Sequence, residues 1–170
     1  MEINRCRDAE TSGSLAADST GCIWHLETLE STHALGRQLA HDLPSGSILL
    51  LHGPLGAGKT SLVQGLAEGV GISEPITSPT FALAQHYSDK QGQTVLVHLD
   101  LYRLEHPAAA DDLFLQEEED ARAMNALMAV EWPERLSINL HEAWRLELSH
   151  RDTSGRRAQL TLPKNVSTSS

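Results

Sequence analysis

Eight consecutive residues, GPLGAGKT, combine residue types that can hold phosphate. They fit the pattern G-x-x-x-x-G-K-[ST], with Gly53, Gly58, Lys59 and Thr60 at its fixed positions. Glycines permit positive φ angles, so successive backbone N–H groups can point into one concavity. Lys59 would bring a cation to the β- and γ-phosphates of a nucleotide, and the Thr60 hydroxyl could ligate Mg²⁺. The pattern therefore predicts a phosphate-binding loop, or P-loop.

The segments on either side of this loop suit that interpretation. The apolar run SILLLH (47–52) predicts a strand buried on both faces. The following segment, KTSLVQGLAEGVG (59–71), predicts an amphipathic helix. Unpaired amides and the helix dipole favour anions at a helix N-terminus, which is where the loop would deliver a phosphate.

Two carboxylates are candidates for the metal and water partners that a P-loop needs. Asp100 closes the apolar strand VLVHLD, and Glu131 closes ALMAVEW (126–132) in the same way. Such partners lie at the carboxyl edge of neighbouring strands. Either residue alone would suit a cap or a surface pair, but two beside a P-loop favour a metal or water role. Which of them would contact the metal directly stays open.

A hydroxyl-rich segment, ITSPTF (76–81), lies between the P-loop helix and the Asp100 strand. Thr77, Ser78 and Thr80 surround Pro79, which restricts the backbone. Such a loop can sense a γ-phosphate and Mg²⁺, as nucleotide switch loops do. A plain Thr/Ser turn is the alternative, and the sequence does not decide between them.

The rest of the chain alternates strands and helices. The pattern predicts an edge strand at 23–28, a helix at 31–43 with Ser31 as its N-cap, a hairpin from strands 81–87 and 94–100, one or two short helices within 107–124, and a second hairpin within 144–162. This order indicates an α/β fold: a P-loop NTPase-like sandwich, with a parallel central sheet, antiparallel edge hairpins and helices on both faces. We expect one domain at 22–163, a disordered extension at 1–21 and a flexible tail at 164–170.

Composition limits the classes of partner. The chain has 170 residues, with 13 basic and 23 acidic residues and a formal net charge of −10. Affinity for a nucleic-acid backbone depends on clustered Lys and Arg, so this balance argues against a domain that grips nucleic acid by itself. There is neither a signal pattern nor an apolar run near the ~20 residues of a membrane span. We therefore expect a cytoplasmic protein without membrane contact, and Cys6 and Cys22 as reduced thiols.

Four blocks carry a family resemblance, namely GPLGAGKTSL, TSPTF, HLDLYRL and VEWPER. In order and spacing they resemble the TsaE family, the P-loop ATPases of bacterial tRNA threonylcarbamoyladenosine synthesis. The resemblance extends from about Trp24 to Leu162, and LYRLE and the Glu131–Trp132 pair are its most specific parts. Two features depart from the family: Pro54 stands where Asp is usual, and AADDLFLQEEED (109–120) lacks a usual glycine.

The resemblance implies an activity, cofactors and partners. TsaE-like proteins bind ATP with Mg²⁺, hydrolyse it weakly alone and act with a TsaD–TsaB complex, which transfers a threonylcarbamoyl group to tRNA. The protein would then meet tRNA only indirectly, through that complex.

The resemblance also implies roles for site residues. Thr60 and Glu131 would belong to the Mg²⁺ shell, and Asp100 would hold metal-bound water or orient the attacking water. Trp132 would lie by the nucleotide, or else be a core or rim aromatic. Lys59, Asp100 and Thr80 would act in catalysis. Tyr102 and Arg103 would bind a partner or brace the switch loop, and Arg103 is a candidate for stabilising transition-state charge. The residues implied to cradle the phosphates are Gly53, Leu55, Gly56, Ala57, Gly58, Lys59, Thr60 and Ser61.

Three other P-loop functions are alternatives. A small-molecule kinase would need an arginine-rich lid, for which the only cluster is Arg151, Arg156 and Arg157, and no acceptor site is visible. A GTPase is disfavoured because no N-K-x-D signature occurs. A nucleotide-gated assembly subunit without turnover differs from an ATPase in whether Asp100 and Glu131 do chemistry or only hold Mg²⁺.

Overall fold

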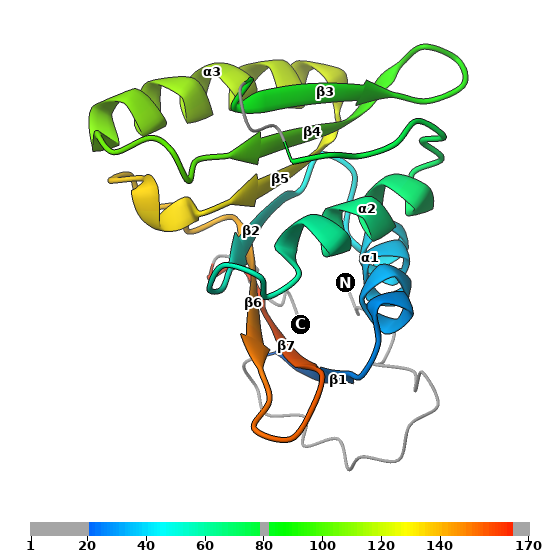
Figure 1. Ribbon diagram of the computed structural model, residues 1–170. Helices are drawn as coiled ribbons and strands as arrows, with labels where there is room; N and C mark the ends of the chain where they lie inside the picture. Colours follow the sequence, from blue (N-terminus) through cyan, green and yellow to red (C-terminus); the bar gives the residue numbers. More distant parts are fainter. Residues whose placement is uncertain (1–20, 79–81, 165–170) are drawn as a thin grey trace, which may run out of the picture.

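The computed structural model describes residues 21–78 and 82–164, and within them the chain forms one mixed sheet of seven strands in the order β1-β7-β6-β2-β5-β4-β3 (Figure 1). The elements in chain order are β1 (Cys22–Leu26), α1 (Leu29–Asp42), β2 (Ile48–His52), α2 (Lys59–Gly69), β3 (Ala84–Ser88), β4 (Thr94–Asp100), α3 (Pro107–Met124), β5 (Leu127–Glu131), the 3₁₀ turn η1 (Pro133–Arg135), β6 (Trp144–His150) and β7 (Arg156–Thr161).

The sheet has a parallel centre and antiparallel edges, which confirms the expected fold class. Strand β2 pairs in parallel with β5 and β6, and β5 pairs in parallel with β4. The hairpin β6–β7 carries β1 at one edge, and β3 pairs antiparallel with β4 at the other. The carboxyl ends of β2, β4 and β5 therefore meet at one sheet edge, directly beside the loop that follows β2.

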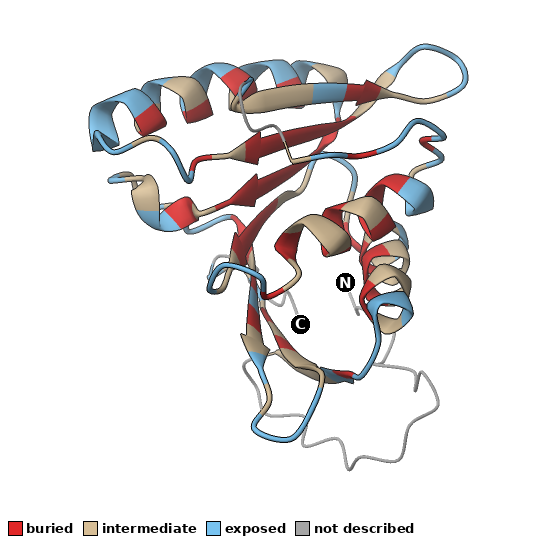
Figure 2. Ribbon diagram, in the orientation of Figure 1, coloured by how far each residue is buried: buried red, intermediate tan, exposed pale blue. Residues whose placement is uncertain are grey.

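Helices cover both faces of the sheet, and β2 shows why. Its Leu49 and Leu51 belong to the core under α1 and α2, whereas Leu50 belongs to the core that includes Phe114 of α3. All three leucines are at most 1 % exposed, and the middle of each of the strands β2, β4 and β5 is buried (Figure 2). A strand packed on both faces makes a stiff base for the loop at its end.

Helix α1 begins earlier than the sequence pattern predicts. The N-cap is Thr28, not Ser31, and the two residues form a capping box. Ser31 N–H donates to Thr28 Oγ1 at 3.1 Å, and Thr28 N–H donates to Ser31 Oγ at 3.0 Å. The prediction was wrong because Ser31 is the N3 member of the box, where its side chain serves the cap from inside the first turn.

Two glycines bring α1 and α2 into backbone contact. A Cβ on Gly65 of α2 would lie 2.3 Å from the His33 carbonyl oxygen of α1. A Cβ on Gly36 of α1 would lie 2.5 Å from the Leu62 carbonyl oxygen. Only glycine fits at such approaches, so this crossing fixes the position of α2 against α1 and the sheet.

Two further expectations need correction. The strand expected at 81–87 begins only at Ala84, after Leu83 with φ +59° breaks the extended backbone. Cys22 is disulfide-bonded in the structure, so the expected reduced thiol is wrong there, and Cys6 lies outside the described residues. Of the one or two short helices expected within 107–124, the structure has one, and it is 18 residues long. Within the described residues, none of the helices has the length and apolar character needed to span a membrane.

Candidate functional site

The loop between β2 and α2 takes the curled form that the glycine pattern predicts. Gly53, Gly56 and Gly58 have φ angles of 145°, 79° and 101°. Helix α2 starts at Lys59 with Gly58 as a left-handed N-cap that provides no side-chain hydrogen bond. The first amides of α2 are therefore left for an external acceptor, as in an anion-binding helix terminus.

Lys59 is held across the mouth of this loop. Its Nζ donates to the carbonyl oxygens of Gly53 at 2.5 Å and Pro54 at 3.0 Å. Nζ also lies 4.1 Å from the centre of the Trp132 ring, a cation–π distance. Burial lowers the pKa of the Lys59 amine, and the carboxylates of Glu131, Glu134 and Asp100 act in the opposite direction. The loop thus presents a positive group beside acidic ones.

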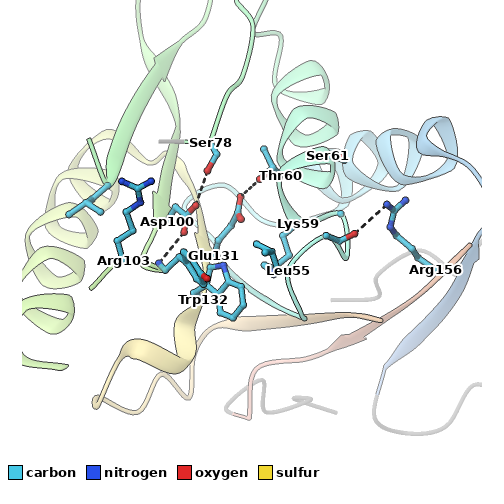
Figure 3. Close-up of a pocket in the computed structure, with 14 residues that line it drawn as sticks. Leu55, Lys59, Thr60, Ser61, Ser78, Asp100, Arg103, Glu131, Trp132 and Arg156 are labelled. Carbon is cyan, nitrogen blue, oxygen red and sulfur yellow. Dashed lines mark hydrogen bonds between the residues drawn. The ribbon is translucent and has the colours of Figure 1, made fainter. Parts of the chain in front are cut away.

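Glu131 joins the loop helix to the neighbouring strand. It closes β5, lies opposite Leu51 of β2 and is 3 % exposed. The Thr60 hydroxyl donates to its Oε1 at 3.0 Å (Figure 3). The hydroxyl and carboxylate predicted to share a metal are therefore in direct contact.

Asp100 lies beside Glu131, since the two residues are paired in register at the ends of β4 and β5. Its Oδ2 accepts a hydrogen bond from the Ser78 hydroxyl at 2.8 Å, and its Oδ1 accepts from the Tyr102 N–H at 3.1 Å. Ser78 belongs to the hydroxyl-rich segment, so the beginning of that segment does reach the site. Thr80 lies outside the described residues, and its predicted role stays a prediction.

These groups line one pocket of about 580 Å³, within the size range of small-molecule sites. Of the residues predicted to hold phosphate, Gly53 and Ala57 are absent from its lining, and the side chain of Ala57 is fully buried. The lining residues are Leu55, Gly56, Gly58, Lys59, Thr60, Ser61, Ser78, Leu83, Asp100, Tyr102, Arg103, Glu131, Trp132 and Arg156 (Figure 3).

Two aromatic residues form one wall of the pocket. Trp132 follows β5 with a left-handed backbone, φ +58°, which turns its ring back over Lys59. Tyr102 packs on Trp132 with ring centroids 4.8 Å apart, and it is 43 % exposed. Trp132 is thus a rim aromatic at the pocket, which is compatible with either of the roles considered for it.

Arg156 is a site residue that the sequence pattern did not single out for the pocket. It opens β7, and its Nη2 donates to the Gly56 carbonyl oxygen at 3.4 Å. Its Nε is buried without a hydrogen-bond partner among the described residues. The guanidinium lies on the side of the loop away from Glu131 (Figure 3). An arginine held there is a second cation for an anionic ligand.

The donor set fits a magnesium-bound nucleotide. The open amides and two cations suit phosphate oxygens, and hydroxyl and carboxylate oxygens are the ligands that Mg²⁺ takes in proteins. Together, the curled loop between a buried strand and a helix, and the carboxylates on adjacent strand ends, define a P-loop fold.

Comparison with known proteins identifies the family within this class. The crystal structure of Bacillus subtilis YdiB superposes with a TM-score of 0.65 at 26% sequence identity, covering 84% of this chain and 86% of YdiB. The family model "Threonylcarbamoyl adenosine biosynthesis protein TsaE" matches residues 26–158. The chain therefore belongs to the TsaE family, and the resemblance seen in the sequence blocks is confirmed.

Named relatives agree with this assignment. A tRNA threonylcarbamoyladenosine biosynthesis protein TsaE from Nostoc is 44% identical over 133 residues, 78% of this chain and 80% of the relative. The protein of that name from Synechocystis is 47% identical over 112 residues, 65% of this chain and 69% of the relative. That from Mycobacterium bovis is 42% identical over 135 residues, 75% of this chain and 80% of the relative.

Proposed function

We propose that this protein is a Mg²⁺-dependent, ATP-binding and ATP-hydrolysing subunit that supports tRNA threonylcarbamoyladenosine modification together with a TsaD–TsaB complex. The observation that carries the proposal is the contact of Thr60, the last P-loop residue, with the buried carboxylate of Glu131, beside Lys59. A P-loop used only as a structural turn would not need a hydroxyl, a carboxylate and an amine gathered at its mouth.

The phosphates of ATP would be held by the loop from both sides. The amides of residues 56–61 form the cradle, and Lys59 supplies a cation that already spans the loop through Gly53 and Pro54. Arg156 supplies a second cation from β7. Hydrogen bonds between ionised partners are stronger than neutral ones, so both should add affinity for ATP and ADP.

Thr60 and Glu131 would hold Mg²⁺, with Asp100 next to them on β4. When bound, Mg²⁺ neutralises charge on the phosphates and polarises them toward attack. Asp100 would hold or orient the water molecule, because its carboxylate is itself fixed by Ser78 and the Tyr102 amide. A carboxylate locked in this way can accept a hydrogen bond in a defined direction.

The proposed partners are proteins, and the proposed compartment is the cytoplasm. A net charge of −10 suits a subunit that docks on protein and meets tRNA only through the TsaD–TsaB complex. The exposed Tyr102 and Arg103, next to the pocket, are the proposed contacts with that complex.

Phosphate release from ATP by the purified protein, with Mg²⁺ and with EDTA, tests the enzymatic part. We expect slow turnover that needs Mg²⁺ and is lost in Lys59→Ala. Turnover unchanged in Lys59→Ala would show a contaminating activity and contradict the proposal. Phosphate appearing on an added small-molecule acceptor rather than in water would favour a P-loop kinase instead.

A further inference from the structure

A buried histidine in β4 is not accounted for by the proposed roles. His98 is 0 % exposed and interrupts the apolar run between Val95 and Leu99 of β4. A buried polar ring costs free energy unless its nitrogens find partners. An aliphatic side chain would pack there without that cost, so a specific contact must explain the histidine.

That contact is with Glu131. His98 Nε2 lies 2.9 Å from Glu131 Oε1, and both side chains are almost fully buried. Since a carboxylate oxygen only accepts, Nε2 is the donor and carries the ring proton. The other ring nitrogen, Nδ1, is buried without a partner in the described part of the chain. Among the described residues, the hydrogen bond to Glu131 is therefore the polar contact that this ring makes.

The sheet register explains how the ring reaches the site. Asp100 is paired with Glu131, and His98 with Ala129, two residues earlier on both strands. Side chains two residues apart lie on the same face of a strand. Leu96 and Ala129 belong to the core under α1 and α2, so His98, Asp100 and Glu131 share the face on which α2 presents Thr60.

Glu131 Oε1 accepts two hydrogen bonds of different character. One comes from Thr60 at 3.0 Å and the other from His98 at 2.9 Å. In the proposed function the Thr60 oxygen also binds Mg²⁺. Its hydrogen bond to Glu131 would then change when the metal binds, so this bond alone does not fix the carboxylate. His98 is held inside the sheet. Among the described residues both bonds fall on Oε1, which leaves Oε2 as the available acceptor.

We propose that His98 is a positioning residue that orients the Glu131 carboxylate for a divalent cation. This inference rests on the proposed function, because it assigns Glu131 to the Mg²⁺ shell. Groups that hydrogen-bond to a metal ligand fix its orientation, and their loss typically weakens metal binding by about 10- to 100-fold. His98 should therefore act on Mg²⁺ dependence and not on the nucleotide itself.

Calorimetric titration with ADP, in Mg²⁺ and in EDTA, separates these effects. In His98→Leu, which removes the donor, we expect the Mg²⁺ concentration for half-maximal tightening of ADP binding to rise by about tenfold. ADP affinity in EDTA should change less than about twofold, since no phosphate contact is lost. His98→Gln, whose amide can donate near the position of Nε2, should restore most of the Mg²⁺ dependence.

Val97→Ala is the matched control for destabilisation. Val97 is the fully buried neighbour in β4 and faces the α3 core instead. It should lower the thermal unfolding temperature without moving the Mg²⁺ midpoint. If His98→Leu does not fold, His98→Asn serves in its place, because the asparagine amide is too short to reach Glu131 and should give the same shift.

The outcomes keep the two proposals apart. A Mg²⁺ midpoint in His98→Leu or His98→Asn equal to that of the parent protein would overturn the positioning role alone. So would equal losses of ADP affinity in Mg²⁺ and in EDTA. A parent protein whose ADP binding does not respond to Mg²⁺ would overturn the proposed function, and the His98 inference with it.

Discussion

The Thr60 hydroxyl donates a 3.0 Å hydrogen bond to Glu131 Oε1, across 71 positions of sequence. This bond joins the first turn of α2 to the end of β5. It is possible because β2 and β5 are parallel neighbours, so the loop after one strand lies beside the last residue of the other. The proposed Mg²⁺ site depends on this contact, since it brings together the hydroxyl and the carboxylate that we propose as metal ligands.

Glu131→Gln should strongly reduce Mg²⁺-dependent hydrolysis while sparing nucleotide binding in EDTA. An amide keeps the shape but removes the negative charge that a divalent cation requires. We expect a fall in the rate of phosphate release of about 100-fold or more, because metal stabilisation of the transition state is worth several kcal/mol. Glu147→Gln, at an exposed position of β6, is the charge-matched control and should behave like the parent. A rate of phosphate release in Glu131→Gln equal to that in Glu147→Gln would show that Glu131 has no role in hydrolysis.

Asp100→Ala separates an ATPase from a nucleotide gate. Asp100 accepts from Ser78 and the Tyr102 amide, so removing it should misplace the attacking water more than the phosphates. The expected result is hydrolysis reduced about 100-fold with ATP affinity retained within about threefold. Loss of ATP binding with no separate effect on turnover would instead support a subunit that uses Mg²⁺ and ATP only to assemble.

Arg156→Ala should weaken nucleotide binding, whereas Arg157→Ala should not. The two arginines are neighbours in β7, but Arg156 donates to Gly56 at the P-loop and Arg157 donates to Gln159 on its own strand. A charge-assisted hydrogen bond is worth about 1.5–3 kcal/mol, so losing one should raise the Kd for ADP by at least about tenfold. Isothermal titration with ADP measures this. The same Kd for both variants would mean that Arg156 only braces the loop.

Gly65→Ala should destabilise the protein although alanine favours helices by about 1 kcal/mol over glycine. The added Cβ would meet the His33 carbonyl oxygen at 2.3 Å, and α1 backbone cannot move out of the way without disturbing the core. Overpacking of this kind costs typically about 1–3 kcal/mol or more, which would lower the thermal midpoint by several degrees. Gln116→Ala, on the exposed side of α3, is the control. A midpoint at or above that of the parent would contradict the close helix crossing.

The local sequence pattern was enough to predict the P-loop and its two neighbouring carboxylates. It could not predict contacts that depend on which strands pair in the sheet. Gly53 to Thr60 could be assigned because their spacing is local, and Asp100 and Glu131 because each ends an apolar strand. Arg156 could not, since its contact with Gly56 depends on β6 pairing in parallel with β2 and carrying β7 beside the loop.

His98 was missed for a related reason. It stands inside the apolar run VLVHLD, where a single histidine gives no periodic signal. Its contact with Glu131 depends on the strand register that pairs Asp100 with Glu131. The helix start was also local but was placed three residues late, because both Thr28 and Ser31 are good capping residues and only the box geometry decides between them.

The most direct test of the central claim is the rate of Mg²⁺-dependent ATP hydrolysis, measured with the protein alone and after addition of purified TsaD and TsaB from the same organism. We expect slow turnover alone, a rise of at least about tenfold with both partners, and no activity in Lys59→Ala under either condition. Turnover that is the same with and without TsaD and TsaB would contradict the proposed partnership.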